Sequence, residues 1–292
     1  MSNEVAQAAA RAREASLILA QATRATKDAA LLAMADALVA ATSQILAANA
    51  ADVAAAVAEG NPAHMSDRLK LGQSRVADFA QGVRDVANLP DPIGEVVRGS
   101  TLPNGLQLQQ LRVPMGVIGM IYEGRPNVTA DAAAICLKAG SASLLRGSKS
   151  AQNSNRVIAE TMREAIARVG LPADLIQAIS AERRETSTDL MTARGLVDLV
   201  IPRGGAGLIQ AVVENATVPV IETGTGNVHV YVDADADLEM ALNIVMNSKT
   251  HRNSVCNSAE SLIVHRDIAD EFLPIVISAL IDAGVTIHGD KA

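Results

Sequence analysis

The sequence predicts an α/β protein in which a mainly parallel sheet is covered by helices on both faces, followed by a second, shorter α/β segment. From Gly116 onward, short apolar runs typical of strands alternate with longer amphipathic runs typical of helices. The chain has 292 residues, 49% of them hydrophobic, which is enough for one large or two ordinary domains. We place the boundary between residues 223 and 224.

Before the sheet, residues 4–58 predict two long alanine-rich helices with a break near residues 23–27. The sequence Gly60-Asn61-Pro62 ends the second. We expect a third helix with Ser66 as its N-cap, running to about Ala87.

Residues 95–113 predict a β-hairpin whose turn is Pro103-Asn104-Gly105. The apolar alternation shifts within 106–113, which predicts a bulge in the second strand. The hairpin is equally consistent with an arm that joins subunits and with an ordinary surface ribbon.

The alternating part of the chain predicts strands at 117–122, 142–145, 175–179, 197–201 and 218–222, with helices at 128–139, 151–169, 186–193 and 206–215. The second segment predicts strands at 229–232, 261–265 and 285–287, and helices at 238–249 and 268–283. Because this segment supplies few strands, we expect it to be an incomplete domain in a truncated chain.

The bulk composition excludes several classes of function. A formal net charge of −7, with only two Tyr, two Phe and no Trp, disfavours binding to nucleic acid or anionic membranes. The N-terminus does not resemble a signal peptide, and no apolar run reaches the roughly 20 residues of a membrane span. Two cysteines suggest no disulfide framework, so we expect a reducing cytoplasm. The five histidines lack metal-ligand spacing, and we expect no metal.

Cys256 lies where an amphipathic helix gives way to an apolar strand, beside Lys249, His251 and Arg252. Nearby positive charge favours the thiolate, which is the nucleophilic form. The residues alone support a catalytic nucleophile and a small buried cysteine about equally.

Cys136 is instead predicted to be a core residue. It belongs to one stripe of a helix, formed with Val128, Ala132, Ile135 and Ala139.

Polar and glycine residues follow several of the predicted strands. The loop Arg146-Gly147-Ser148-Lys149 suits a phosphate or phosphorylated ribose, or is a solvated loop with two surface cations. The turn Gly204-Gly205 is a weak signal for phosphate binding before a helix. Asn127 could cap the next helix or donate to an oxyanion. Glu222 ends an apolar strand and either points into a site or lies on the surface.

Together these segments resemble the aldehyde dehydrogenase superfamily and, within it, the gamma-glutamyl phosphate reductase family. The resemblance is carried by Arg112-Val113-Pro114-Met115-Gly116-Val117-Ile118-Gly119, Tyr122-Glu123-Gly124-Arg125-Pro126-Asn127-Val128-Thr129, Asp131-Ala132-Ala133, Leu137-Lys138, Ile201-Pro202-Arg203-Gly204-Gly205, Glu222-Thr223-Gly224 and Ser254-Val255-Cys256-Asn257. It implies a Rossmann-type cofactor domain in residues 1–223, a catalytic domain in 224–292, and a hairpin arm at 94–113 for oligomerisation.

The resemblance also implies an activity, the NADPH-dependent reduction of L-glutamyl 5-phosphate to L-glutamate 5-semialdehyde with release of phosphate, in L-proline biosynthesis. Cys256 matches the nucleophile that forms a thioester, and Asn127 matches the oxyanion-hole amide. Glu222 matches a glutamate that activates water in thioester-hydrolysing relatives. Hydrolysis here would waste the acyl group, so we expect Glu222 to shuttle protons or position a ligand. A homo-oligomer, and an upstream glutamate kinase as a partner, are further expectations.

The same resemblance gives the loops a role. Arg146 and Lys149, with Ser148, favour the 2′-phosphate of NADP(H), and the Gly204-Gly205 turn would face the pyrophosphate. On grounds of charge, we expect Arg125, Lys249 and Arg252 to bind the phosphate and carboxylate of the substrate.

The chain departs from the family pattern in two places. The family usually has proline where this chain has Asn253, which should loosen the turn before the nucleophile by roughly 0.4–1 kcal/mol of unfolded-chain entropy. Family members also continue well beyond residue 292. The alternatives are a related acyl-phosphate or acyl-CoA reductase, or an inactive chain that only binds nucleotide.

Overall fold

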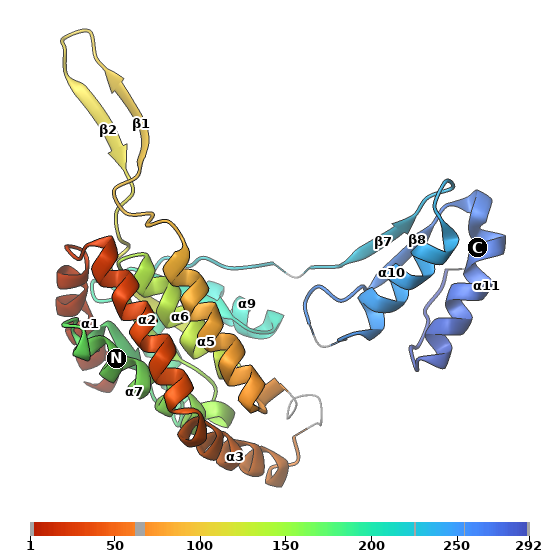
Figure 1. Cartoon of the computed structure of the whole chain (residues 1–292), viewed down its shortest axis with the longest axis horizontal. Helices are drawn as coiled ribbons and strands as arrows, with labels where there is room; N and C mark the ends of the chain where they lie inside the picture. The colour runs from red at the N-terminus through yellow and green to blue at the C-terminus, as the bar shows by residue number, and fades with distance from the viewer. Residues whose placement is uncertain (1–2, 62–67, 225, 254, 291–292) are drawn as a thin grey trace. The chain divides into compact units, whose positions relative to one another are not determined.

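The computed structural model describes residues 3–61, 68–224, 226–253 and 255–290 (Figure 1). The chain forms two compact units, Met1–Thr223 and Gly224–Ala292. Each unit has its own hydrophobic core, and that of the second unit is small, formed by residues such as Val245, Phe272 and Val276.

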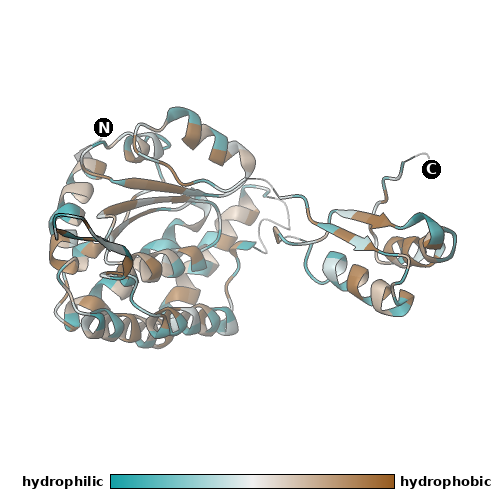
Figure 2. Cartoon of the chain, turned by 90° about the horizontal axis from the view of Figure 1, so that it is seen from above, coloured by the Kyte–Doolittle hydropathy of each residue, from teal (hydrophilic) through white to brown (hydrophobic). Residues whose placement is uncertain are grey.

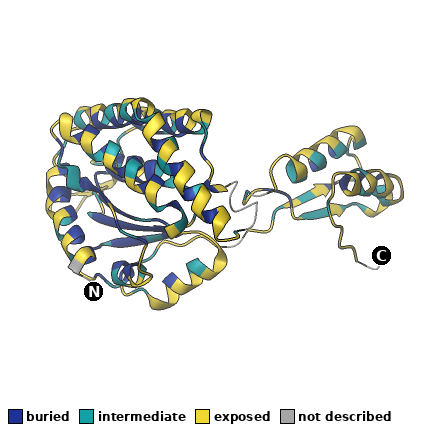
Figure 3. Cartoon of the chain, turned by 90° about the horizontal axis from the view of Figure 1, so that it is seen from below, coloured by how far each residue is buried: buried dark blue, intermediate teal, exposed yellow. Residues whose placement is uncertain are grey.

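A parallel sheet of four strands lies at the centre of the first unit. The strands are β3 (Val117–Tyr122), β4 (Ala142–Arg146), β5 (Ile176–Ala178) and β6 (Leu199–Arg203), in the order β5-β4-β3-β6. Every residue of β3 is buried, as the dark blue strands of Figure 3 show. The connections run outward from β3 to β5 and then return to β6 on the other side of β3. The carboxyl ends of β3 and β6 therefore flank a topological switch point, where ligands bind in such folds.

Helices cover both faces of this sheet, and Figure 2 shows the apolar strands between them. The helices of the first unit that the structure describes in full are α1 (Asn3–Leu19), α2 (Arg24–Ala40), α3 (Thr42–Ala58), α5 (Gln73–Asn88), α6 (Asn127–Lys138), α7 (Gln152–Arg168), α8 (Glu185–Met191) and α9 (Ala206–Asn215), with short 3-10 turns η1 (Lys149–Ala151) and η2 (Ala173–Leu175). α6 and α7 pack with α2, α3 and α5 on one side, and α1, α8 and α9 contact the strands from the other. The predicted α/β class is confirmed.

The prediction of two helices over residues 4–58 is wrong, because this region forms three. The second predicted helix breaks at Ala41, where α2 and α3 meet at 66°. The Thr42 hydroxyl donates to the Val39 carbonyl oxygen at 2.6 Å, a local bond that competes with the helical ladder. The bend lets α3 contact α7, with Asp52 accepting from the Ser154 backbone N–H at 2.8 Å.

The helix predicted from Ser66 to Ala87 is interrupted, because Arg68 and Leu69 are helical but residues 70–72 are not. α5 begins at Gln73 with Gly72 as its N-cap, and Ser66 lies outside the described residues. The backbone before it is held by α3 instead, because the Leu71 N–H donates to the Asn49 side-chain oxygen at 2.7 Å. A long-range partner of this kind leaves no local signal in the sequence.

The predicted hairpin is present as β1 (Val96–Thr101) and β2 (Gln107–Leu111), paired antiparallel. Its bulge is in the first strand, not the second as predicted, because Val97 is the extra residue between the pairs 96–111 and 98–110. The turn is a three-residue loop in which Gly105 has a φ of +85°. All residues of both strands are exposed, and Figure 1 shows the ribbon extending away from the helices of its own unit.

Two predicted strands are not formed. Residues 218–222 make only an isolated bridge, Val200 with Val220, beside β6. Pro219 lacks an N–H and so interrupts a ladder there, although its carbonyl oxygen accepts from Val200 at 2.8 Å. Residues 285–287 form no strand in the described part of the chain.

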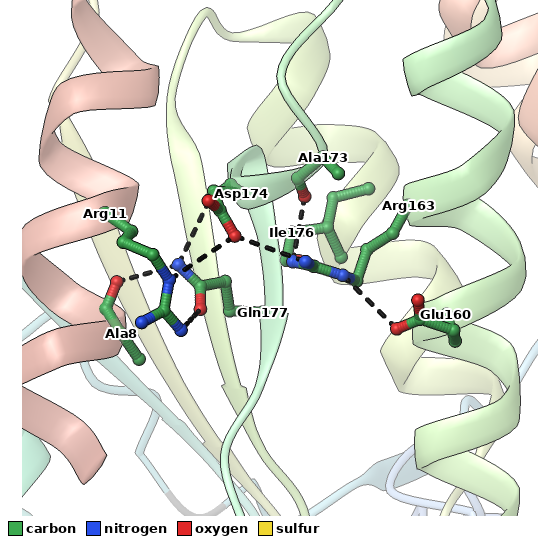
Figure 4. Close-up of polar contacts among 8 residues, drawn as sticks. All are labelled: Ala8, Arg11, Glu160, Arg163, Ala173, Asp174, Ile176 and Gln177. Atoms are coloured by element: carbon green, nitrogen blue, oxygen red, sulfur yellow. Dashed lines mark hydrogen bonds and ion pairs between the residues drawn. The ribbon is translucent and has the colours of Figure 1, made fainter.

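Charged side chains close the outer edge of the sheet at β5 (Figure 4). Arg163 of α7 donates to the carbonyl oxygens of Ala173 and Ile176 at 3.0 and 2.5 Å. Its guanidinium also lies 3.2 Å from Asp174, which is 3.6 Å from Arg11 of α1. The bond to Ile176 satisfies a carbonyl oxygen that the edge strand would otherwise leave unpaired, and the bond to Ala173 holds the preceding turn η2.

Two buried ion pairs join α2 to the ends of α5 and α6. Lys27, only 2% exposed, lies 2.5 Å from Asp91. Lys138 lies 2.5 Å from Asp28 and donates to the Ala87 carbonyl oxygen at 2.8 Å. The Asp91 side chain also accepts from the Ile93 N–H at 3.0 Å, so the pair fixes the segment that leads into the hairpin.

The second unit is a parallel strand pair with two helices. Its elements are β7 (His229–Val232), α10 (Leu238–Thr250), β8 (Ser261–Val264) and α11 (Arg266–Asp282). Asp237 caps α10 by accepting from the Met240 N–H at 2.9 Å. Among described helices of either unit, none alone has the length and apolar composition of a membrane span, and only the bent pair α2 and α3 passes that test jointly.

Candidate active site

Three loops meet at the carboxyl edge of the sheet in the first unit. The loop after β3 is joined to the turn before α9, since the Glu123 N–H donates to the Arg203 carbonyl oxygen at 3.2 Å and the Glu123 carboxylate accepts from the Gly205 N–H at 2.9 Å. Gly124 of the same loop lies against the Ser150 hydroxyl, beyond β4. The strand register places Arg146 beside Ile121, and Tyr122 beside Arg203, so the three loops are neighbours.

Asn127 does not cap α6 with its side chain, so the capping prediction is wrong. The helix begins at Asn127 itself, after Pro126 as the N-cap, and no side-chain capping bond forms. The Asn127 amide nitrogen donates instead to the Asp131 carboxylate at 3.0 Å, one turn on. Burial raises the pKa of Asp131, and the bond from Asn127 offsets part of that rise. A carboxylate only accepts, so it holds the NH₂ side of the amide toward itself and leaves the second N–H for another acceptor.

The loop Arg146–Lys149 carries two cations. Arg146 is half-buried and donates only to neutral acceptors: the Gly147 and Arg183 carbonyl oxygens at 3.1 and 3.3 Å, and the Thr186 hydroxyl at 3.4 Å. The Ser148 hydroxyl bonds that of Ser150 at 2.8 Å, and Lys149 is exposed. Arg146 is thus oriented, and its charge is not neutralised by a described carboxylate.

Gly147 packs against a network of buried polar side chains, Tyr122, Thr129 and Asn155. The hydroxyls of Tyr122 and Thr129 share a hydrogen bond of 2.7 Å, and Thr129 donates to Asn155 at 3.0 Å. All three side chains are buried, and burial raises the pKa of Tyr122. A Cβ on Gly147 would lie 2.1 Å from the Asn155 amide nitrogen and 3.1 Å from the Tyr122 ring.

Gly147→Ala is therefore expected to lower the free energy of unfolding by about 1–3 kcal/mol, because the network or the loop must shift. Denaturant unfolding measures the loss. Gly124→Ala is the matched control, since its Cβ would make ordinary contacts of 3.6 and 3.9 Å with Ser150 and Ser148. Equal losses in the two variants would contradict the steric argument.

The remaining predicted residues of this unit are less enclosed. Gly204 and Gly205 are exposed, and the Gly205 N–H is already occupied by Glu123. Glu222 is exposed after the segment that bridges to β6. Arg125 is half-buried, and its N–H donates to the Glu123 carbonyl oxygen at 2.6 Å.

Cys256 lies in the second unit, in the loop between α10 and β8, and its side chain is exposed. The interpretation of Cys256 as a buried core residue is therefore wrong. The loop is held to the end of α10, because the Ala259 N–H donates to the Ser248 carbonyl oxygen at 3.0 Å and the buried Ser258 hydroxyl donates to the same oxygen at 3.2 Å. Lys249 donates to the Ala259 carbonyl oxygen at 2.9 Å.

Other predicted residues around the thiol differ in burial. Arg252 and Asn253 are exposed, and Ser254 lies outside the described residues. Lys249 reinforces the loop through its bond to a carbonyl, a role that the charge argument did not foresee. The assignment of Lys249 and Arg252 to substrate binding stays a prediction.

Cys136 is confirmed as a core residue. It is buried on α6, and burial raises the pKa of its thiol to about 12. Ile135 of the predicted stripe is instead 58% exposed, because it lies on the solvent side of α6, whereas the residues before and after it are buried.

The structure thus brings the Arg146 loop, Asn127 and the glycine turn together, and presents Cys256 in a separate unit. Sequence reasoning missed Glu123, Asp131 and Thr186. The i, i+4 spacing of Asn127 and Asp131 on one helix was a usable signal, whereas the other two contacts depend on tertiary structure. The described residues contain no group of three or more His, Cys, Asp or Glu side chains arranged to hold a metal.

Comparison with known proteins supplies the family. The model of the aldehyde dehydrogenase family matches residues 1–287. The gamma-glutamyl phosphate reductase of Thermobifida fusca (strain YX) is 57% identical over 288 residues, covering 99% of this chain and 69% of that protein. The enzyme of the same name from Kineococcus radiotolerans is 58% identical over 280 residues, covering 96% and 65%.

A solved structure agrees with these sequences. The crystal structure of gamma-glutamyl phosphate reductase from Thermotoga maritima matches with a TM-score of 0.89 and 41% identity, covering 97% of this chain and 68% of that one. The chain therefore spans about two thirds of the length of these relatives. It belongs to the aldehyde dehydrogenase family and, within that family, to the gamma-glutamyl phosphate reductases.

Proposed function

We propose that the protein reduces L-glutamyl 5-phosphate to L-glutamate 5-semialdehyde with NADPH and releases phosphate, as a step of proline biosynthesis in the cytoplasm. The observation that carries this proposal is the 57–58% identity to reductases named for this substrate, across nearly the whole chain. The exposed thiol of Cys256, on a loop fixed to the end of α10, supports it.

Cys256 is the nucleophile. Its thiolate attacks the acyl carbon of the substrate, the C–O bond to phosphate breaks, and phosphate leaves with the bonding electron pair, so a thioester forms on sulfur. The cofactor, when bound, supplies the hydride that reduces the thioester carbon. The resulting thiohemiacetal releases the aldehyde when its C–S bond breaks, and the electron pair of that bond re-forms the thiolate.

Asn127 stabilises the negative oxygen that develops in both tetrahedral species, together with the backbone N–H of Cys256. Asp131 is the residue that orients it. Because the Asn127 amide nitrogen donates to the Asp131 carboxylate at 3.0 Å, its second N–H has a fixed direction and the amide is kept from flipping.

The chemistry of the Arg146 loop fits a phosphorylated dinucleotide. Arg146 and Lys149 offer positive charge without a described carboxylate partner, and the Gly147 backbone lies where no Cβ can be accommodated. Arg146, Ser148 and Lys149 bind the ribose 2′-phosphate in this proposal. A pyrophosphate at Gly204 and Gly205 would share or replace the bond that Glu123 makes to Gly205.

The substrate itself needs positive charge at both ends. Arg125, Lys249 and Arg252 are proposed to bind its phosphate and carboxylate, and Glu222 to shuttle protons or position a ligand. The exposed apolar residues of the hairpin, including Leu108 and Leu111, support an arm that joins identical subunits. A glutamate kinase is the proposed source of the substrate, because an acyl phosphate is short-lived in water.

The test runs the reaction in reverse, with glutamate semialdehyde and NADP⁺ as substrates. NADPH formation is expected to depend on inorganic phosphate and to stay near background when coenzyme A or water alone is the acyl acceptor. A requirement for coenzyme A would reassign the protein to an acyl-CoA reductase. Oxidation without any added acceptor would indicate a hydrolytic aldehyde dehydrogenase.

A further inference from the structure

The segment between β5 and α8 lies directly against the Arg146 guanidinium. Arg146 Nη2 donates to the Arg183 carbonyl oxygen at 3.3 Å, and Arg146 Nε donates to the Thr186 hydroxyl at 3.4 Å. Thr186 is fully buried, and its hydroxyl lies 2.8 Å from the Arg183 carbonyl oxygen. These contacts place the Arg183–Arg184 peptide beside Arg146, and the charge of Arg184 is close enough to act on the Arg146 guanidinium.

The positive charge of this pair is not balanced by the residues around it. Burial, and then the charge of Arg184, lower the pKa of Arg146. The neighbouring charged residues do not neutralise this pair. Glu182 accepts a hydrogen bond from Gln152 at 3.2 Å, and Arg183 lies 3.8 Å from Glu4. Glu185 forms no ion pair with a described cation. Neither Arg146 nor Arg184 has a carboxylate partner within the described ranges.

Two guanidinium groups whose charges act on each other repel, and an anion bound by both removes the repulsion. Arg146 is oriented by three bonds to neutral acceptors, which leaves its charge available while fixing its position. Lys149, exposed at the start of η1, adds a third cation to the same edge of the sheet. Three cations suit a phosphate monoester, which carries up to two negative charges, better than a singly charged diester.

We propose that Arg184 is a specificity-determining residue that binds, together with Arg146, the 2′-phosphate on the adenosine ribose of the cofactor. The proposal rests on the function given above, since it assigns a ligand of that cofactor. It adds a residue from a second loop, after β5, to a site that the sequence placed only in the loop after β4. Arg184 thereby favours NADPH over NADH, because only NADPH carries this phosphate.

The experiment measures binding to the whole chain, without turnover. Dissociation constants for NADPH and NADH are determined by calorimetry for the unmodified protein, Arg184→Gln and Arg183→Gln. Arg184→Gln is expected to weaken NADPH binding by about 10- to 100-fold, the loss of charge-assisted bonds to phosphate, and to change NADH binding by less than about twofold. Arg183→Gln is the matched control, because Arg183 is adjacent, exposed and paired with Glu4, and it should change neither constant by more than about twofold.

Fragments separate the 2′-phosphate from other phosphate groups. The unmodified chain is expected to bind 2′-AMP more tightly than 5′-AMP, and Arg184→Gln should remove that difference while inorganic phosphate competes only weakly. Equal weakening of NADPH and NADH by Arg184→Gln, or an equal effect of Arg183→Gln, would overturn the assignment. Discrimination that is lost in Arg146→Gln but kept in Arg184→Gln would remove Arg184 from the site and leave the proposed reductase function intact.

Discussion

Cys256→Ser is expected to lower kcat for the reduction of glutamyl phosphate on the order of 10⁶-fold, the scale seen when a covalent nucleophile is removed. A serine hydroxyl is protonated at neutral pH and attacks the acyl phosphate poorly. It also forms an ester, which is a weaker hydride acceptor than a thioester. Because Cys256 is exposed, the substitution should leave the free energy of unfolding within about 0.5 kcal/mol.

A single-turnover experiment checks this expectation. Enzyme in excess over acyl phosphate should release phosphate before any NADPH is oxidised, and Cys256→Ser should show no such release. Cys136→Ser is the control in the same chain, since Cys136 is buried on α6 and takes no part in the proposed chemistry. It should keep kcat and lose about 1–3 kcal/mol of stability, because a hydroxyl replaces an apolar thiol in the core. Full activity in Cys256→Ser would refute the thioester mechanism.

Lys27→Met is expected to lower the free energy of unfolding by about 3–5 kcal/mol, a large fraction of the stability of an ordinary domain. Lys27 is 2% exposed and lies 2.5 Å from Asp91, so its removal leaves a largely buried carboxylate without its paired cation. Denaturant unfolding at neutral pH measures the change. The double variant Lys27→Met, Asp91→Asn should recover at least about 1 kcal/mol, because the introduced amide is uncharged and its oxygen can still accept from the Ile93 N–H.

The same pair predicts a dependence on pH. Burial alone would raise the pKa of Asp91, but the bond and charge of Lys27 and the Ile93 N–H outweigh it and hold that pKa below its usual value. A carboxyl group whose pKa is lower in the folded state contributes stability above its unfolded pKa, near 4, and loses that contribution as the pH falls through the folded pKa. Unfolding free energy should therefore decrease below about pH 4, and less steeply in Asp91→Asn. Equal slopes in the two proteins would contradict this account.

Hydrophobic periodicity was sufficient to predict the α/β class and most strands and helices, because burial on the sheet leaves a clear pattern. It failed where a single side chain decides the backbone. The Thr42 hydroxyl marks the bend between α2 and α3, and Pro219 limits 218–222 to one bridge. The break before α5 includes Leu71, whose N–H is bound by Asn49, and that residue is distant in the sequence.

For the candidate site, the residue types at strand ends were enough to name the loops but not their internal contacts. The Asn127 side chain turned to Asp131 instead of the helix N-terminus, and Glu123 occupied the N–H of Gly205. Thr186 and Arg184 could not be linked to Arg146 from spacing alone, since only the order of β4 and β5 in the sheet makes them neighbours. For Cys256, the surrounding residues supported a nucleophile and a buried cysteine equally, and the exposed side chain removes only the second of these.

The contacts of Arg163 and Arg11 at the edge of β5 also limit how copies of this chain can associate. Arg163 occupies the outward carbonyl oxygens of Ala173 and Ile176, and Asp174 holds α1 in front of the strand through Arg11. A strand from another chain would have to displace these bonds before it could extend the sheet on this side. These bonds therefore protect the central sheet against open-ended polymerisation at this edge.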